Sequence, residues 1–256
     1  MKIAIAGAGN MGSAILTGLK AAGQTELLAL NPVNPRVSEF ATANQIELVH
    51  TPADLIAKHP AVVILTTPAP ITLDVARQLA DLPADTLLIS AAAGVKLADL
   101  QAALPNHGLA AMIPNTPVAV NAGTIGLALG STLTAAQTTT ITELLDQLGD
   151  VIKVKEADLD IIGVVGGCGP AFVDVLMDAF ADAAVKHGLN RQTAYQVVAS
   201  MVKGSGSLAT ATGLAPALLR DQVTSPGGTT IQGVSALEAH GFRGAAIAAI
   251  DAASGK

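Results

Sequence analysis

Two glycine-containing stretches of this chain hold the residues that are best suited to bind a cofactor or a substrate. The first, near the N-terminus, lies between an apolar run at residues 2–6 and a helical pattern at residues 13–22. Its G-x-G-x-x-G sequence in that context is the dinucleotide-binding fingerprint, in which glycines allow a tight turn, close approach of a pyrophosphate and close helix packing. The sequence therefore predicts a site for a hydride-carrying dinucleotide at Gly7, Gly9, Asn10, Met11 and Gly12.

The second stretch, residues 219–232, contains Ser-Pro-Gly-Gly-Thr-Thr and runs into a helical pattern. Thr229 followed three residues later by Gln232 matches a capping box, which predicts that a helix starts there, at about Thr230. Two glycines just before a helix N-terminus leave backbone N–H groups free to bind a small anion such as a carboxylate. The alternative is a loop whose only role is to cap the helix.

The second apolar run, residues 26–30, ends in a segment that bears on the choice of cofactor. NAD-binding proteins usually place Asp or Glu here, where it holds the ribose 2′-hydroxyl. Residues 31–36 contain neither, but Asn31, Asn34 and Arg36 could bind a 2′-phosphate. The segment therefore favours NADP(H) over NAD(H), which stays possible, and the alternative is that Arg36 is a solvated residue at a helix start.

Short apolar runs alternate with helical patterns over the first half of the chain. Runs at residues 61–65, 86–90 and 108–113 follow the first two, and this alternation predicts a parallel, doubly wound sheet. Loops that follow parallel strands line one edge of the sheet, where ligands bind. This adds cofactor-binding candidates from the later loops, namely Thr66, Thr67, Pro68, Ala91, Ala92, Ala93 and Asn115. None of these loops contains Asp, Glu, His or Cys, which argues against acid–base catalysis from this domain, and His50 and His59 are interpreted as surface residues.

A strand-like run at residues 122–129, a helix at 134–148 and a strand at 151–154 close the first domain, for which we expect the bounds 1–156. Residues 157–256 are predicted to be all helical, with an interruption at Gly166–Pro170. The helix that continues from Ala171 is apolar on most faces, which implies a partner, and we expect it to form a dimer interface. The acidic stripe on this helix is interpreted as solvated.

Composition excludes several classes of protein. The 256 residues carry a net charge of −6, so the chain lacks the basic surface that nucleic acids require. Cys168 is the single cysteine, and no group of Cys, His and acidic residues has metal-ligand spacing. The apolar run at residues 161–173 is shorter than the ~20 residues that span a bilayer. We therefore expect a soluble, cytoplasmic protein with no metal, nucleic-acid or membrane partner.

Five motifs, in order and spacing, resemble those of the pyrroline-5-carboxylate reductase family over essentially the whole chain. They are Gly7–Gly12, Ala92–Val95, Ile113–Pro117, Gly167–Phe172 and Leu219–Thr230. The resemblance implies hydride transfer from NAD(P)H to the C=N bond of 1-pyrroline-5-carboxylate, which gives proline. It also implies a Rossmann-type domain followed by a helical dimerisation domain, often within a larger ring of dimers. By the same resemblance, Ser225, Gly227, Gly228 and Thr229 hold the substrate carboxylate, and Thr230 faces the ring nitrogen as the catalytic residue.

The chain departs from the family pattern at three places. Thr66-Thr67-Pro68 stands where Val-Lys-Pro is common, Gly166–Phe172 lacks two hydroxyls and a phenol, and Ala110-Ala111 replaces a segment that commonly has Arg. Two alternatives stay open. A β-hydroxyacid dehydrogenase shares the layout but needs a general acid, usually Lys, on the long helix, where Lys186 is the only candidate and lies at the wrong end. A catalytically silent NADP-binding sensor is the other.

Overall fold

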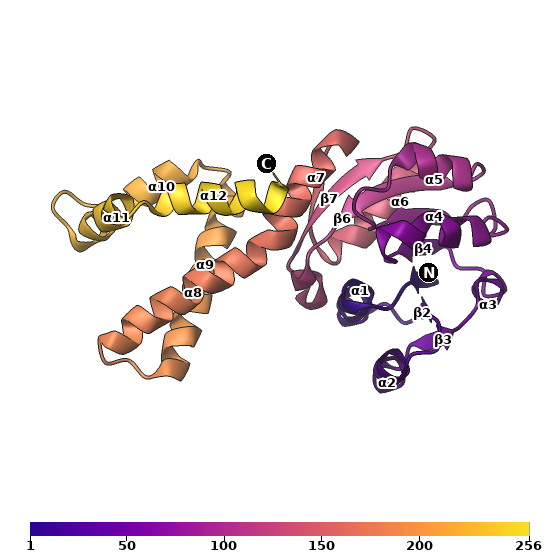
Figure 1. Cartoon of the computed structure of the whole chain (residues 1–256), viewed down its shortest axis with the longest axis horizontal. Coiled ribbons are helices and arrows are strands. Elements are labelled where there is room, and N and C mark those ends of the chain that lie inside the picture. The colour runs from indigo at the N-terminus through magenta and orange to yellow at the C-terminus, as the bar shows by residue number, and fades with distance from the viewer. Residues whose placement is uncertain (256) are drawn as a thin grey trace. The chain divides into compact units, whose positions relative to one another are not determined.

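The computed structural model describes residues 1–255, which divide into two compact units (Figure 1). The first unit comprises Met1–Cys168 and the second begins at Gly169. The boundary lies inside a helical stretch, residues 156–186, rather than at residue 156. The division of function at residue 156 stays a prediction, since compactness of the backbone is a different property from the extent of a functional domain.

The first unit is built on one eight-stranded sheet with the order β3-β2-β1-β4-β5-β6-β7-β8. The strands are β1 (Ile3–Ala6), β2 (Leu27–Leu30), β3 (Glu47–Val49), β4 (Val62–Leu65), β5 (Leu87–Ser90), β6 (Gly108–Ile113), β7 (Gly123–Leu129) and β8 (Gly149–Lys153). Five of the strands that precede β7 were predicted, because they are apolar runs bounded by turn residues and are almost fully buried. All neighbouring pairs are parallel except β6 and β7.

Helices cover both faces of this sheet. They are α1 (Asn10–Ala21), α2 (Pro35–Asn44), α3 (Pro52–Ile56), α4 (Ala69–Gln78), α5 (Leu97–Ala103) and α6 (Ala135–Asp146). Alternate strand residues enter two separate cores: Ile3 and Ile5 pack with residues of α1, α2 and α6, while Ala4 and Ala6 pack with residues of α3, α4 and α5. A sheet buried on both faces is what a doubly wound fold requires, so the predicted Rossmann-type architecture is confirmed.

The sheet departs from parallel pairing at one place, which the sequence patterns did not define. β7 runs antiparallel to β6, with Ile113 paired with Gly126. Only a short 3₁₀ helix, η1 (Thr116–Val120), separates the two strands. A parallel return needs a crossover of a dozen or more residues, so this short connection enforces the antiparallel pairing. The structure also contains α2 and β3, which the sequence patterns did not define.

The second unit consists of helices and the loops that join them over residues 169–255. Its helices are α8 (Gly169–Lys186), α9 (Arg191–Thr212), α10 (Pro216–Gln222), α11 (Thr229–Ala239) and α12 (Phe242–Ser254). The interruption expected at Gly166–Pro170 takes the form of a π-helical segment, Gly163–Cys168, that follows α7 (Leu159–Ile162). A π segment widens the helix by one residue per turn, so Pro170 is accommodated at the start of α8 without ending the helix.

Residues 156–186 are also, by length and composition alone, long and apolar enough to cross a membrane. The sequence expectation considered only residues 161–173 and therefore underestimated the length of this stretch. Its apolar side chains on α8 are exposed in the single chain, among them Val175, whose exposed fraction is 70%. Exposed apolar surface of this kind marks an interaction site.

The predicted capping box at the start of α11 is wrong. Thr229 is the first helical residue, and the extended N-cap residue is Gly228, which has no side chain to offer. The side chain of Gln232 reaches instead to the carbonyl of Gly227, with Nε2 to O at 3.3 Å. Gly227 has a φ of +67°, and this left-handed turn shifts the helix start one residue earlier than the sequence pattern suggested.

Candidate functional site

A cleft of about 670 Å³ opens at the carboxyl ends of β1 and β4. The chain continues from β1 toward β2 on one side and from β4 toward β5 on the other, so the two loops diverge and leave a crevice. Eight of the predicted cofactor-binding residues line this cleft: Gly7, Gly9, Asn10, Met11, Asn31, Thr66, Thr67 and Pro68. The topology thus gathers residues from three loops that are up to sixty positions apart in sequence.

The Gly-rich turn has the geometry that a pyrophosphate needs. Gly7 has a φ of +103°, which turns the chain from β1 into α1. A Cβ atom on Gly12 would lie 2.1 Å from the carbonyl oxygen of Gly7, so only glycine allows α1 to pack this close to the turn. A Cβ on Gly9 would meet nothing within 4 Å. Gly9 is therefore not required by packing, and the open space beside it is available to a ligand.

Thr66 fixes the Gly-rich turn from the neighbouring strand. Its hydroxyl donates to the carbonyl oxygens of Gly7 and Ala6, at 2.5 and 3.2 Å. The hydroxyl of the next residue, Thr67, lies 2.9 Å from the hydroxyl of Thr72 on α4. The two threonines that stand at the Val-Lys positions of the family pattern thus stiffen the floor of the cleft with neutral hydrogen bonds and bring no charge to it.

The side chains predicted to bind a 2′-phosphate form a short hydrogen-bond network after β2. Asn31 Oδ1 accepts the backbone N–H of Ala8 at 3.1 Å, which ties the end of β2 to the Gly-rich turn. Asn34 caps α2 through the N–H groups of Arg36 and Val37. The guanidinium of Arg36 donates to Asn10 Oδ1 at 3.0 Å, so its charge is held beside the N-terminus of α1. Arg36 is exposed and keeps further N–H donors for an anion.

Several residues of the cleft were missed by the sequence patterns. His50, Pro52, Ile71, Val75 and Gln78 line the same space. His50 is exposed, as expected of a surface residue, but it also lies at the cleft: β3 pairs with β2 so that Val49 lies opposite Leu30, which places the next residue beside Asn31. Because β3 was not predicted, no sequence pattern could have placed His50 there. The spacing of Ile71, Val75 and Gln78 on one face of α4 was a usable signal.

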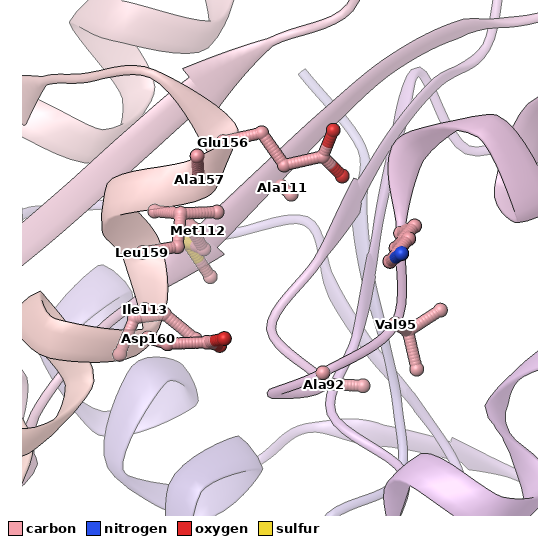
Figure 2. A pocket seen from close by; sticks show the side chains of 11 residues that line it. Ala92, Val95, Ala111, Met112, Ile113, Glu156, Ala157, Leu159 and Asp160 are labelled. Atoms are coloured by element: carbon pink, nitrogen blue, oxygen red, sulfur yellow. The ribbon is translucent and has the colours of Figure 1, made fainter. Parts of the chain in front are cut away.

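The remaining predicted cofactor residues lie outside this cleft. Ala92 lines a second cavity, of about 380 Å³, between the loop after β5, strand β6 and residues 156–160. Figure 2 shows the carboxylates of Glu156 and Asp160 projecting toward the loop that carries Ala92 and Val95. Glu156 Oε1 accepts the N–H of Leu97 at 2.5 Å, so this carboxylate caps α5, which has no side-chain cap of its own.

Asn115 is buried, with an exposed fraction of 6%. Its Nδ2 donates to the carbonyl of Gly166 at 2.9 Å, and its Oδ1 accepts the N–H of Thr124 at 2.8 Å. The side chain thus joins the end of β6 to the π-helical segment and to β7. A role for Asn115, Ala91 and Ala93 in cofactor binding stays a prediction.

The Ser-Pro-Gly-Gly loop belongs to the second unit. Ser225, Thr229 and Thr230 are exposed there. The first hydrogen bond of α11 runs from Gln232 N–H to the carbonyl of Gly228, at 3.4 Å. The N–H groups of Thr229, Thr230 and Ile231 precede it and therefore have no intrahelical acceptor. A Cβ on Gly228 would lie 2.4 Å from Ser225 Oγ, so the absence of a side chain at Gly228 is what lets the serine hydroxyl lie against the helix end.

A doubly wound sheet with a glycine-rich turn at its switch point defines the class: a dinucleotide-dependent oxidoreductase fold. The family model described as "NADP oxidoreductase coenzyme F420-dependent" matches residues 2–94, and the model of pyrroline-5-carboxylate reductase dimerisation matches residues 156–256. The pyrroline-5-carboxylate reductase of Pisum sativum is 34% identical over 97% of this chain and 92% of its own length. That of Escherichia coli is 34% identical over 97% and 94%.

Solved structures agree over the same extent. A pyrroline-5-carboxylate reductase from Coxiella burnetii matches with a TM-score of 0.85 and 30% identity, covering 99% of this chain and 96% of that one. The Plasmodium falciparum pyrroline carboxylate reductase, solved with NADP bound, matches with a TM-score of 0.83 and 25% identity, covering 99% and 95%. The chain belongs to the pyrroline-5-carboxylate reductase family. The resemblance of its motifs to that family is thereby confirmed.

Proposed function

We propose that this protein reduces 1-pyrroline-5-carboxylate to L-proline, the last step of proline biosynthesis, with NADP(H) as the preferred cofactor and NAD(H) as a possible one. The observation that carries the proposal is the cleft at the switch point, with open space at Gly9, in a chain that shares its whole length with this family. When bound, the reduced cofactor supplies the hydride.

The residues of the chain suit this reaction because it requires little acid–base chemistry. A protonated imine is already electrophilic, so positioning of the reactants can supply most of the rate enhancement. The Ser225–Thr229 segment holds the substrate carboxylate through the serine hydroxyl and the free N–H groups at the start of α11. The hydroxyl of Thr230 orients the ring nitrogen or delivers a proton to it.

The preference for the phosphorylated cofactor rests on the segment after β2. Asn31, Asn34 and Arg36 offer neutral or positive groups there, where an acidic side chain would repel a 2′-phosphate. Arg36 is already held against Asn10, which reduces the entropy lost when its guanidinium binds a phosphate. Gly7, Gly9 and Met11 would hold the pyrophosphate of the cofactor, and Thr66, Thr67 and Pro68 form the floor of the cleft.

The second unit forms a homodimer through its exposed apolar helices, and dimers assemble into a larger ring. The match of the dimerisation model to residues 156–256 supports the first of these statements. Coverage by a second copy also accounts for the long apolar stretch at residues 156–186, so the proposal includes no membrane partner and a cytoplasmic location. The net charge of −6 supports the absence of a nucleic-acid partner.

One assay tests the proposed activity. Purified protein is mixed with NADPH or NADH and with 1-pyrroline-5-carboxylate, and separately with a panel of hydroxyacids and keto acids, while absorbance of the reduced cofactor is recorded. We expect oxidation of NADPH with 1-pyrroline-5-carboxylate only, with a higher kcat/KM than for NADH. Turnover of hydroxyacids would instead support a β-hydroxyacid dehydrogenase, and NADPH binding without any turnover would support a silent sensor.

A further inference from the structure

The cofactor cleft has one end with a distinct composition. Pro32, Pro52, Ile71 and Val75 give it apolar walls, and His50 and Gln78 are the polar side chains that accompany them. Pro52 begins α3, while Ile71, Val75 and Gln78 share one face of α4. A concave, mostly apolar space with a few placed polar groups is the usual form of a small-molecule site, and such a lining suits a heteroaromatic base. Among the described residues that line the cleft, His50 is the only ionisable one.

The hydrogen bonding of His50 fixes what its ring can offer to a ligand. Nδ1 lies 2.8 Å from the carbonyl oxygen of Asn31. A carbonyl oxygen only accepts, so Nδ1 carries the proton of the neutral ring. Nε2 then has a lone pair and no proton, and it acts as an acceptor. The bond also fixes the orientation of the ring, because Asn31 is itself tied to the Gly-rich turn through Ala8.

The side-chain amide of Gln78 is also held by a hydrogen bond to the backbone. Its Nε2 donates to the carbonyl of Asp74 at 3.2 Å, one turn earlier on α4. The side-chain amide then offers a ligand its Oε1, an acceptor, and the second N–H of Nε2. Both polar side chains therefore present an acceptor, and that of His50 presents no donor.

We propose that His50 and Gln78 recognise the adenine of the cofactor through its exocyclic 6-amino group. The inference rests on the proposed function, since it assumes that the cleft holds NADP(H). A 6-amino group carries two N–H donors, which match two acceptors. A base with oxygen at C6 places an acceptor against Nε2 of His50, and such acceptor–acceptor contact is penalised far more than a missing hydrogen bond. The site thus selects the base independently of the 2′-phosphate.

The test compares NADPH with its 6-oxo analogue, nicotinamide hypoxanthine dinucleotide phosphate in reduced form. The two differ only in the base, so hydride transfer and 2′-phosphate binding are matched. At pH 8 we expect kcat/KM with 1-pyrroline-5-carboxylate to be at least about tenfold higher for NADPH. The difference should lie in KM rather than in kcat, because the base is remote from the reacting carbon.

Variants of His50 test whether its Nε2 acceptor recognises the base or whether the side chain only shapes the cleft. His50→Asn keeps an N–H that can reach the Asn31 carbonyl but removes the acceptor at Nε2, and it should lower the selectivity for NADPH over the 6-oxo analogue several-fold. His50→Gln places an amide oxygen near the position of Nε2 and should retain the selectivity. Gln78→Leu should lower it as well. His59→Asn is the matched control: His59 lies outside the cleft, and its φ of +50° suits Asn.

Equal use of the two cofactors by the wild-type protein would overturn the inference, as would unchanged selectivity in His50→Asn. A loss in His50→Asn that affects NADPH but not NADH would also overturn it, because it would place the 2′-phosphate at His50. Failure to oxidise NADPH at all would contradict the proposed function instead. Equilibrium binding of both dinucleotides, followed by fluorescence of the reduced nicotinamide, then decides the inference alone, and equal or absent binding refutes it.

Discussion

Two glycines of the Gly-rich turn have opposite surroundings, and this difference gives a test of the cofactor site. Gly9 adopts φ −69°, ψ −160°, which alanine also tolerates, and a Cβ there meets no protein atom within 4 Å. Gly9→Ala should therefore leave the melting temperature nearly unchanged. It should weaken NADPH binding at least about tenfold, since the methyl occupies the space of the pyrophosphate.

Gly12→Ala should instead lower the stability of the fold. Its Cβ would lie 2.1 Å from Gly7 O and 2.8 Å from Thr66 Oγ1, so α1 has to move away from the turn. Overpacking of this kind costs about 1–3 kcal/mol of stability. Thermal unfolding and NADPH titration of both variants check the pair. Full NADPH affinity in a folded Gly9→Ala variant would show that the ligand does not approach the turn there.

Thr230 is the residue assigned to the ring nitrogen. Thr230→Ala should lower kcat/KM for 1-pyrroline-5-carboxylate by about 100-fold or more, the contribution typical of a positioned proton donor. NADPH affinity should not change, because Thr230 belongs to α11 and not to the cofactor cleft. Thr230→Ser keeps the hydroxyl and should recover most of the activity. Undiminished kcat/KM in Thr230→Ala would refute the assignment.

The pairing of α8 with α9 has its own spectroscopic probe. Tyr195 on α9 donates its phenol hydrogen to Asp178 on α8, with the oxygens 2.9 Å apart. This hydrogen bond, together with desolvation and the nearby negative charge, raises the pKa of Tyr195 above its ordinary value. The guanidinium of Arg191, 5.4 Å from the ring centroid, opposes the shift. The stabilisation from this bond is thus fully present below the pKa of an unfolded tyrosine and is lost as pH rises through the folded value.

Ultraviolet difference titration measures this directly, because Tyr195 is the single tyrosine and the chain has no tryptophan. We expect the native protein to ionise at a higher pH than the denatured protein, whose tyrosine titrates near about 10. Asp178→Asn removes the charge and should shift the native midpoint downward. Identical midpoints in native and denatured protein would mean that the Tyr195–Asp178 hydrogen bond is absent in solution.

Individual helices and strands show where sequence patterns are enough to predict an element and where they are not. β1, β4 and β5 are apolar runs that end in turn residues, and local composition defines them. β3 is three residues long with one of them buried, so its identity depends on pairing with β2. α2 carried usable signals, a capping Asn34 and Pro35 at its first position. The capping box at Thr229 failed because the backbone turn at Gly227, not side-chain chemistry, sets the start of α11.

The candidate site also has one part that the sequence predicts and one part that it does not. The Gly-rich turn could be predicted, since the backbone turn at Gly7 and the close packing of Gly12 against it belong to one strand–turn–helix unit. The base-binding end could not, because His50 reaches the cleft only through the register of two strands, and Gln78 through the orientation of α4. Long-range register is a tertiary property, and a single sequence records it weakly.

On the scale of the whole molecule, the surface of the second unit requires a partner. Phe172, Val175 and Phe180 on α8 and Phe242 and Ile247 on α12 have exposed fractions of 36–70%. Residues of α8, α11 and α12 also line an apolar groove of about 490 Å³. Exposed patches of this kind are rare on monomers. We therefore expect light scattering to give a mass of at least two chains of 25.5 kDa.

A pair of matched substitutions locates the interface. Val175, 70% exposed, lies within the region matched by the dimerisation model, whereas Val120, 73% exposed, lies in η1 of the first unit. Val175→Asp places an unpaired carboxylate in the apolar interface and should lower the mass to one chain, with a lower melting temperature. Val120→Asp adds the same charge elsewhere and should leave the dimer intact. A monomeric wild-type protein would contradict the dimer. A dimer that survives Val175→Asp with unchanged affinity would show that the interface lies elsewhere than on α8.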